Sequence, residues 1–322
     1  MQALLKLVMN KVVALILSFG ALLSIMTGGL VKIPDGVLPE IPDDPPAAQV
    51  EIFPGEMTLS AYLSGDDFDV CLAFKGCIAF QKAKQRSLHH IFRIRAVSET
   101  IKKYAPDSIG LQEAHPGWLL ALQAELPAYA YVGIGRDGYV FDEFTPIFYL
   151  KEKYDLVDSG SFWLSETPQK PSKGWDAQLN RICTWAVLRN KETGESYAHF
   201  NTHLDHVGAQ ARLNSVQIIL DKIAELNLPT VCTGDFNVSE GSEVYRGMTA
   251  ALGDSKYLAP DTMSMGTFNG FDMEGLAGKS PIDFLFVTKD TITPKVYRVV
   301  TDLVDGRIPS DHCMIYTDLT LH

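Results

Sequence analysis

The feature that most constrains the fold is an alternation, from residue 56 onward, of short apolar runs with segments of helical periodicity. Apolar side chains recur at helical spacing over residues 94–104 and 213–226, and PDSIGLQE and TVCTGDFN follow them as predicted strands. The sequence contains no internal repeat, and no domain-length linker interrupts the pattern. Strands that alternate with helices are typical of an α/β domain, so we predict one such domain over residues 56–322.

Polar residues mark the ends of five of these apolar runs. They lie in GLQE, NTHLDH, GDFN, PIDF and SDH, and are Glu113, His203, Asp235, Asn237, Asp283, Asp311 and His312. Each alone has an ordinary structural explanation, such as a helix cap, a turn or a hydrogen-bonded sheet histidine. Because the strand ends of one sheet tend to meet at one edge, five such ends together favour a shared site.

The segment TVCTGDFN combines strand character with typical turn formers. A turn at Gly234 is the simple interpretation, since glycine and Asx residues dominate turns. If the backbone instead stays extended, Asp235 and Asn237 share one side of the strand and Phe236 takes the other. We therefore expect both polar side chains to face the site and the phenylalanine to pack behind them.

A sheet edge that carries Glu, Asp, Asn and His side chains suits a hard divalent cation and a phosphate group. Mg²⁺ takes oxygen ligands from one or two carboxylates and keeps waters that substrate oxygens can replace. The five cysteines lack metal-ligand spacing, which argues against structural zinc. Cys71 and Cys77 are close enough in sequence to pair in an oxidising compartment, whereas Cys183, Cys232 and Cys313 lie in apolar runs and are expected in the core.

The five motifs, in this order, closely resemble those of the endonuclease/exonuclease/phosphatase superfamily, which has the DNase I-like fold. The stretches GRDG, PIFY and FWLSETP resemble a bacterial branch of that superfamily. The resemblance implies an α/β fold, a four-layer αββα sandwich of two mixed β-sheets, with the site at one edge. It also implies metal-dependent hydrolysis of a phosphodiester or phosphomonoester by in-line attack of an activated water.

For the metal, the resemblance implies that Glu113 is a ligand of Mg²⁺ or Mn²⁺. Asp311 would be either a second ligand or an acidic residue that lies next to the ligands without binding the metal. The superfamily usually begins with a strand of the form T-x-N, whose asparagine supports the metal site. The corresponding segment here is MTLSAY, which places Ser60 at that position. A serine oxygen has a shorter reach, so we expect weaker metal binding or slower turnover unless the strand is shifted in register.

For the chemistry, the resemblance implies that Asp235 activates or orients the attacking water and that Asn237 holds the phosphate. His203 would stabilise charge on the non-bridging oxygens. Asp283 would orient His312 against the phosphate, since a carboxylate commonly fixes the tautomer of an imidazole. Two assignments of the general base stay open, namely Asp235 and the pair of Asp283 with His312.

Two arginines are candidates for substrate contacts. Arg136 and Arg181 suit a second phosphate or a leaving group, because guanidinium forks match phosphate oxygens, although ordinary salt bridges explain them equally well. Trp163, Trp175 and Trp185 can stack on a base or sugar, but burial is the commoner use. The net charge of −11 argues against a broad groove for nucleic acid, so small phosphoesters rank first.

The first 55 residues differ in composition from the rest. Lys6 and Lys11 precede an apolar run over residues 12–26. This run matches a signal-peptide core and is short for a membrane span. We predict a signal peptide or membrane anchor over residues 1–30, with a secreted, periplasmic or membrane-anchored protein as the result. Residues 31–55 are rich in proline and acids, and we predict an extended linker.

The sequence thus favours an exported, metal-dependent phosphoesterase that acts as a monomer on a small phosphate ester. The departure at Ser60 supports a first alternative, a catalytically weakened protein tethered to the surface that binds a phosphate ligand. A non-specific nuclease is a second alternative, and it would show DNA binding with a steep salt dependence.

Overall fold

A computed structural model describes residues 92–138 and 142–322, all within the compact unit Ile91–His322. The predicted leader, the linker, Ser60 and the Cys71–Cys77 pair lie outside the described residues. Within those residues, no helix has the length and apolar character needed to cross a membrane.

The described strands form three hydrogen-bonded sheets. The largest has the order β4-β5-β6-β7-β10-β8, and the two smaller ones have the orders β1-β3-β2 and β12-β11-β9. The strand bounds are β1 Ser108–Gly110, β2 Tyr129–Val132, β3 Ile147–Leu150, β4 Tyr154–Trp163, β5 Ile182–Asn190, β6 Ser196–His203, β7 Thr230–Asp235, β8 Gly253–Asp254, β9 Asp261–Thr262, β10 Asp283–Val287, β11 Ile292–Val299 and β12 Ile315–Leu321.

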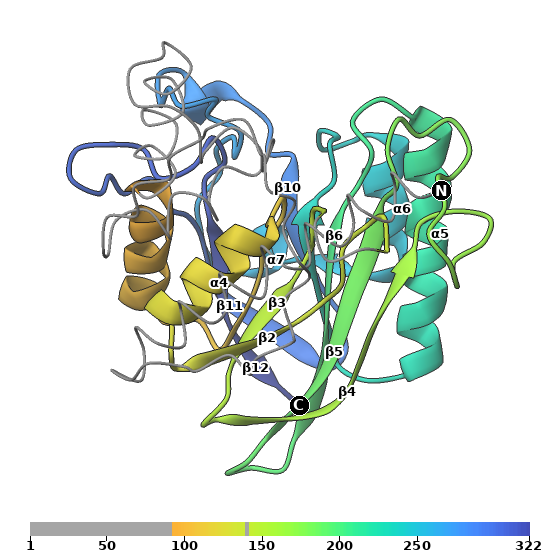
Figure 1. Ribbon diagram of the computed structural model, residues 1–322, viewed down its shortest axis with the longest axis horizontal. Helices are drawn as coiled ribbons and strands as arrows, with labels where there is room; N and C mark the ends of the chain where they lie inside the picture. Colours follow the sequence, from red (N-terminus) through yellow and green to blue (C-terminus); the bar gives the residue numbers. More distant parts are fainter. Residues whose placement is uncertain (1–91, 139–141) are drawn as a thin grey trace, which may run out of the picture. The chain divides into compact units, whose positions relative to one another are not determined.

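Helices cover the outer faces of the sheets (Figure 1). The helix over residues 92–104 and α4 (Pro116–Glu125) lie on the side of the smaller sheets, whereas α5 (Ala209–Leu226) and α6 (Glu243–Ala251) lie on the six-stranded sheet. Shorter turns, α7 (Ser255–Leu258) and the 3₁₀ helix η1 (Leu276–Gly278), occur in the later connections. The arrangement is the predicted αββα sandwich of mixed sheets.

Two apolar cores hold these layers together. One joins the six-stranded sheet to α5 and α6 and includes Phe200, Phe236, Ile219 and Met248. The other lies between the sheets and includes Ile147, Leu188, Val231, Leu285 and Ile292. Burial of large apolar side chains on both faces explains why β10 is continuously hydrophobic after Asp283.

Side chains alternate between the two faces of the sheet along β6. Ala198 and Phe200 face the helices, whereas the alternate side chains face the smaller sheets and bond to them. His199 Nδ1 lies 2.8 Å from Ser108 Oγ in β1, and Asn201 donates its Nδ2 to the carbonyl of Leu111 at 2.8 Å. Polar bonds across the interior therefore fix the two layers against each other near the site.

The simple interpretation of Gly234 as a turn residue is wrong, because this glycine lies inside β7. A Cβ atom at Gly234 would lie 2.4 Å from the backbone oxygen of Thr202, so the glycine permits the close approach of β6 and β7. The strand ends at Asp235, and Asn237 adopts a left-handed backbone with φ 52°. The expectation that the strand stays extended through Asn237, with Asp235 and Asn237 on one side, is therefore also wrong. Phe236 is buried, as predicted.

We expect Gly234→Ala to destabilise the fold by about 1–3 kcal/mol, because the added methyl group must push β6 away from β7. Equilibrium denaturation in urea would measure the change. Gly278→Ala is the matched control, since a Cβ atom there meets nothing within 4 Å. Equal effects of the two substitutions would contradict this explanation of the glycine.

Candidate active site

Strand register brings three of the predicted residues into one row at an edge of the six-stranded sheet. His203 and Asp235 are the last residues of the parallel strands β6 and β7, and they are direct register partners. Asp283 is the first residue of the antiparallel strand β10, and its partner is also Asp235. Asp235 is therefore the centre of the row, as expected for strand ends that meet at one edge.

His312 reaches this row from the segment before β12. Its Nδ1 lies 2.9 Å from Asp283 Oδ2, and its Nε2 lies 3.9 Å from Asp235 Oδ2. His203 Nε2 lies 3.5 Å from the same oxygen of Asp235. Two imidazoles thus converge on one carboxylate oxygen, and one of them is oriented by a second carboxylate.

Burial and charge shift the pKa values of this group in different directions. Burial, followed by repulsion from Asp283, raises the pKa of Asp235 to about 7. Burial lowers the pKa of His312, but the hydrogen bond and the charge of Asp283 outweigh it and raise that pKa to about 9. Burial and the nearby charge of Arg181 hold the pKa of His203 well below its usual value. At neutral pH, His312 is therefore cationic and His203 is neutral.

The backbone after β7 holds Asp235 and Asn237 in a fixed relation. The N–H of Asn237 donates to Asp235 Oδ1 at 2.9 Å, which leaves Oδ2 for the two imidazoles. Asn237 Nδ2 donates to the carbonyl of Leu204 at 3.0 Å. Phe236 packs between them and the core, with its ring 5.2 Å from that of Phe286. Asn237 is thus beside the row, but its amide is oriented by a turn.

A small cavity next to the row is lined by His203 and by three more predicted residues, Glu113, Arg136 and Arg181. Glu113 is exposed, three residues beyond the end of β1, and has a left-handed backbone with φ 55°. The two arginines are already paired, Arg136 with Glu143 and Arg181 with Asp205. The salt bridges are therefore confirmed, and both arginines line the cavity, while their contact with a substrate stays a prediction.

Asp205 is a residue to which sequence reasoning gave no role. It accepts hydrogen bonds from the backbone N–H groups of Gln178, Leu179, Val207 and Gly208. Burial opposes ionisation, but these backbone bonds together lower the pKa of Asp205. The carboxylate thereby ties the loop before Arg181 to the loop after β6. Its position in NTHLDH, two residues after His203 on the same side, was the available signal.

Asp311 lies apart from the row and contacts Arg93, which sequence reasoning also missed. Arg93 Nη2 is 3.7 Å from Asp311 Oδ1, and its Nε donates to the carbonyl of Pro309 at 3.3 Å. Burial lowers the pKa of Arg93, while the charges of Asp311 and Glu113 oppose that shift. The two carboxylates predicted as metal ligands therefore act on one guanidinium group.

The donor atoms suit a hard divalent cation. Asp235, Asp283 and His312 each offer a ligand atom, and these atoms lie within 4.8 Å of one another. In the part of the chain that the structure describes, they are the group that meets this spacing. A protonated His312 has no lone pair for a metal, so the oxygen donors of this group are Asp235 and Asp283, while Glu113 lines the adjacent cavity with His203 and Asp311 acts on His312 through its charge. Carboxylate oxygens are the ligands that Mg²⁺ and Mn²⁺ prefer.

The tryptophans and cysteines serve mainly in packing. Trp163 and Trp185 are buried, and Trp163 Nε1 donates to the carbonyl of Arg136 at 2.5 Å. Cys183, Cys232 and Cys313 are free thiols and buried, as predicted. Trp163 therefore supports the site from behind by fixing the backbone of Arg136.

The family model described as the endonuclease/exonuclease/phosphatase family matches residues 92–312. The chain belongs to this family. The match contains every predicted site residue except Ser60, and it spans the elements that form the row. No curated protein matches the chain.

Solved structures of family members are similar over most of the described chain. A mannosyl-6-phosphatase from Bacteroides thetaiotaomicron is 36% identical, with a TM-score of 0.68, over 75% of this chain and 94% of the other. A family protein from Bacteroides vulgatus is 37% identical, with a TM-score of 0.69, over 72% and 91%. The catalytic domain of human nocturnin, at 18% identity and a TM-score of 0.57 over 71% and 86%, shares the fold.

We expect Asp283→Asn to lower the pKa of His312 from about 9 toward the ordinary value of 6.5, because the substitution removes the charge that stabilises the imidazolium. NMR titration of the imidazole in metal-free protein would measure it. The raised pKa stabilises the folded state fully below about pH 6.5, and this contribution is lost as the pH rises through 9. The exposed Asp290→Asn is the control, and an unchanged His312 pKa in Asp283→Asn would contradict the assignment.

Proposed function

We propose that the protein is an exported phosphoesterase that uses Mg²⁺ or Mn²⁺ to hydrolyse a small phosphate monoester by in-line attack of an activated water. The observation that carries this proposal is the convergence of two imidazole Nε2 atoms on Asp235 Oδ2 at the sheet edge. Membership of the family supports hydrolysis of a phosphoric ester.

The residues of the row, together with His312 and Asn237 beside it, have protonation states and positions that suit this reaction. A pKa of about 7 makes Asp235 a base that accepts a proton near neutral pH. His312, oriented and kept cationic by Asp283, would stabilise negative charge on the phosphate oxygens. His203 is neutral, so it would act as a hydrogen-bond donor, and Asn237 would bind the phosphate from the adjacent turn.

Glu113 and Asp311 would hold the metal, and a contribution of Ser60, which lies outside the described residues, stays a prediction from the sequence. The ion would supply a Lewis acid that offsets phosphate charge. Arg93, whose Nη2 lies 3.7 Å from Asp311 Oδ1, would help to hold that carboxylate in place. Arg136 and Arg181 would contact the substrate only through the parts of their guanidinium groups that the salt bridges leave open.

The substrate class rests on similarity and charge. The Bacteroides relative named as a mannosyl-6-phosphatase supports a sugar monophosphate as the substrate of this chain. The net charge of −11 disfavours long polyanions, which need a cationic groove. Export, with or without a membrane tether, rests on the apolar N-terminal segment and its lysines.

We expect the full chain to release phosphate from hexose 6-phosphates with Mg²⁺ or Mn²⁺, and not with excess chelator. Asp235→Asn should reduce kcat by at least about 10²-fold, because the substitution removes the proposed base. Asp290→Asn is the matched control. Phosphate release would be measured by a colorimetric assay, and activity that survives both chelator and Asp235→Asn would contradict the proposal.

A second test concerns Ser60. If this serine weakens metal binding, Ser60→Asn should lower the Mg²⁺ concentration needed for half-maximal activity, because asparagine is the residue that the family usually carries at this position and has the longer side chain. A metal titration of both proteins would measure the change. If the wild type is inactive and Ser60→Asn restores turnover, the protein is the weakened, phosphate-binding member of the family.

A further inference from the structure

An exposed aromatic ring lies directly against the candidate catalytic histidine. The ring of Phe268 is 47% exposed, and its centroid is 5.0 Å from that of His312, with an angle of 59° between the planes. The backbones of the two residues also form an isolated β-bridge. A large apolar side chain that is half exposed beside a polar site suggests a ligand that covers it.

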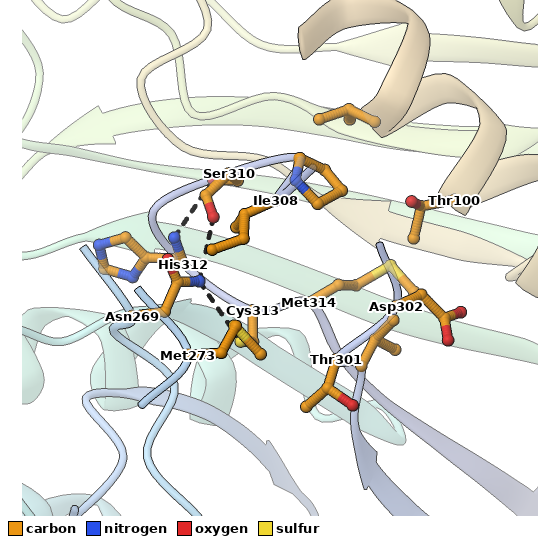
Figure 2. A pocket seen from close by; sticks show the side chains of 13 residues that line it. Thr100, Asn269, Met273, Thr301, Asp302, Ile308, Ser310, His312, Cys313 and Met314 are labelled. Atoms are coloured by element: carbon orange, nitrogen blue, oxygen red, sulfur yellow. Dashed lines mark hydrogen bonds between the residues drawn. The ribbon is translucent and has the colours of Figure 1, made fainter. Parts of the chain in front are cut away.

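The segment that carries Phe268 is anchored to the backbone around His312. The N–H groups of Asn269 and of the next residue both donate to the carbonyl of Asp311, at 2.8 and 3.0 Å. Asn269 Nδ2 donates to the carbonyl of Ser310 at 3.0 Å, and the N–H of Cys313 donates to Thr267 at 2.7 Å. Asn269, Ser310 and Cys313 line a cavity, as Figure 2 shows, together with His312. The anchoring orients Phe268 before any ligand binds.

The backbone after Phe268 adopts an unusual conformation that presents a second ring. Gly270 and Phe271 have φ values of 59° and 64°, and a left-handed backbone is costly for phenylalanine. The side chain of Asn269 supports this turn by accepting the N–H of Phe271 at 2.7 Å. The ring of Phe271 is 42% exposed and lies 5.1 Å from the guanidinium of Arg93. Both rings therefore flank the segment of Asp311 and His312.

We propose that Phe268, with Phe271 beside it, forms a platform for the leaving group of the substrate. This leaving group is a sugar, and the apolar face of its pyranose ring packs on the platform. The proposal rests on the proposed function, because His312 must contact the phosphate that the sugar carries. A phenyl ring offers no hydrogen bond, so it recognises a flat group through its face, which is electron-rich and attracts the C–H groups of a sugar.

The charges around the platform favour a sugar over a nucleotide or a nucleic acid. Asp272 and Glu274 follow Phe271, and both are exposed. Their carboxylates accept hydrogen bonds, as sugar hydroxyl groups require, and they repel additional phosphates. A sugar monophosphate therefore has its single phosphate at His312 and its neutral ring on the platform.

The test compares Phe268→Ala and Phe268→Tyr with the wild type on mannose 6-phosphate and on glycerol 3-phosphate, which has no ring. We expect Phe268→Ala to raise KM for mannose 6-phosphate about tenfold, with kcat and all constants for glycerol 3-phosphate changed less than about twofold. Phe268→Tyr should keep the wild-type KM, because it retains the ring. Val157→Ala, at another exposed apolar side chain, is the control.

Three results would overturn the platform. An equal loss on both substrates would mean that Phe268 only supports His312, and no loss on either would mean that the ring is not used. A larger loss on adenosine 5′-monophosphate than on mannose 6-phosphate would mean that the platform holds the base of a nucleoside leaving group instead.

A binding measurement separates this proposal from the proposed function. Isothermal titration calorimetry of mannose 6-phosphate with metal-free protein needs no turnover, and we expect Phe268→Ala to weaken binding about tenfold. If the wild type binds the sugar phosphate through Phe268 but releases no phosphate, the hydrolase proposal fails and the platform stands. If Phe268→Ala binds as tightly as the wild type, the platform is refuted even in an active enzyme.

Discussion

The pairing of β6 with β7 at Gly234 is the contact on which the candidate site depends. The absence of a side chain at Gly234 allows the backbone of Thr202 to approach, and one residue later this pairing sets His203 beside Asp235. The antiparallel partner β10 then adds Asp283 to the same position. Three polar residues from distant parts of the sequence therefore meet because backbone hydrogen bonds fix the register, and the two apolar cores keep the strands in place.

Burial gives this row its chemical properties. Asp235 lies between another carboxylate and two imidazoles with little access to water, so its proton affinity is raised while that of His203 is lowered. His312 behaves differently, because Asp283 contacts it directly and outweighs the effect of burial. Two residues of the same type, His312 and His203, thus differ in charge according to their contacts.

The sequence predicted more of the catalytic row than of its surroundings. Polar residues at the ends of apolar runs were a direct signal for Glu113, His203, Asp235 and Asp283. Arg93 gave no such signal, because it lies on a helix that the sequence marks only by its apolar spacing. Its contact with Asp311 also joins two residues that are far apart in the sequence. Phe268 was equally hidden, since an aromatic residue in a loop has no periodicity that would distinguish a buried ring from an exposed one.

By itself, the sequence determined the family, the α/β sandwich and the identity of the polar residues at the strand ends, because local periodicity and ordered motifs depend only on neighbours along the chain. Only the tertiary structure decided which atoms meet. It showed that Gly234 serves a close strand contact, that Asn237 lies in a left-handed turn, and that both arginines of the site are paired with carboxylates. These features arise from contacts between residues remote in sequence, which register, burial and charge fix together once the layers have packed.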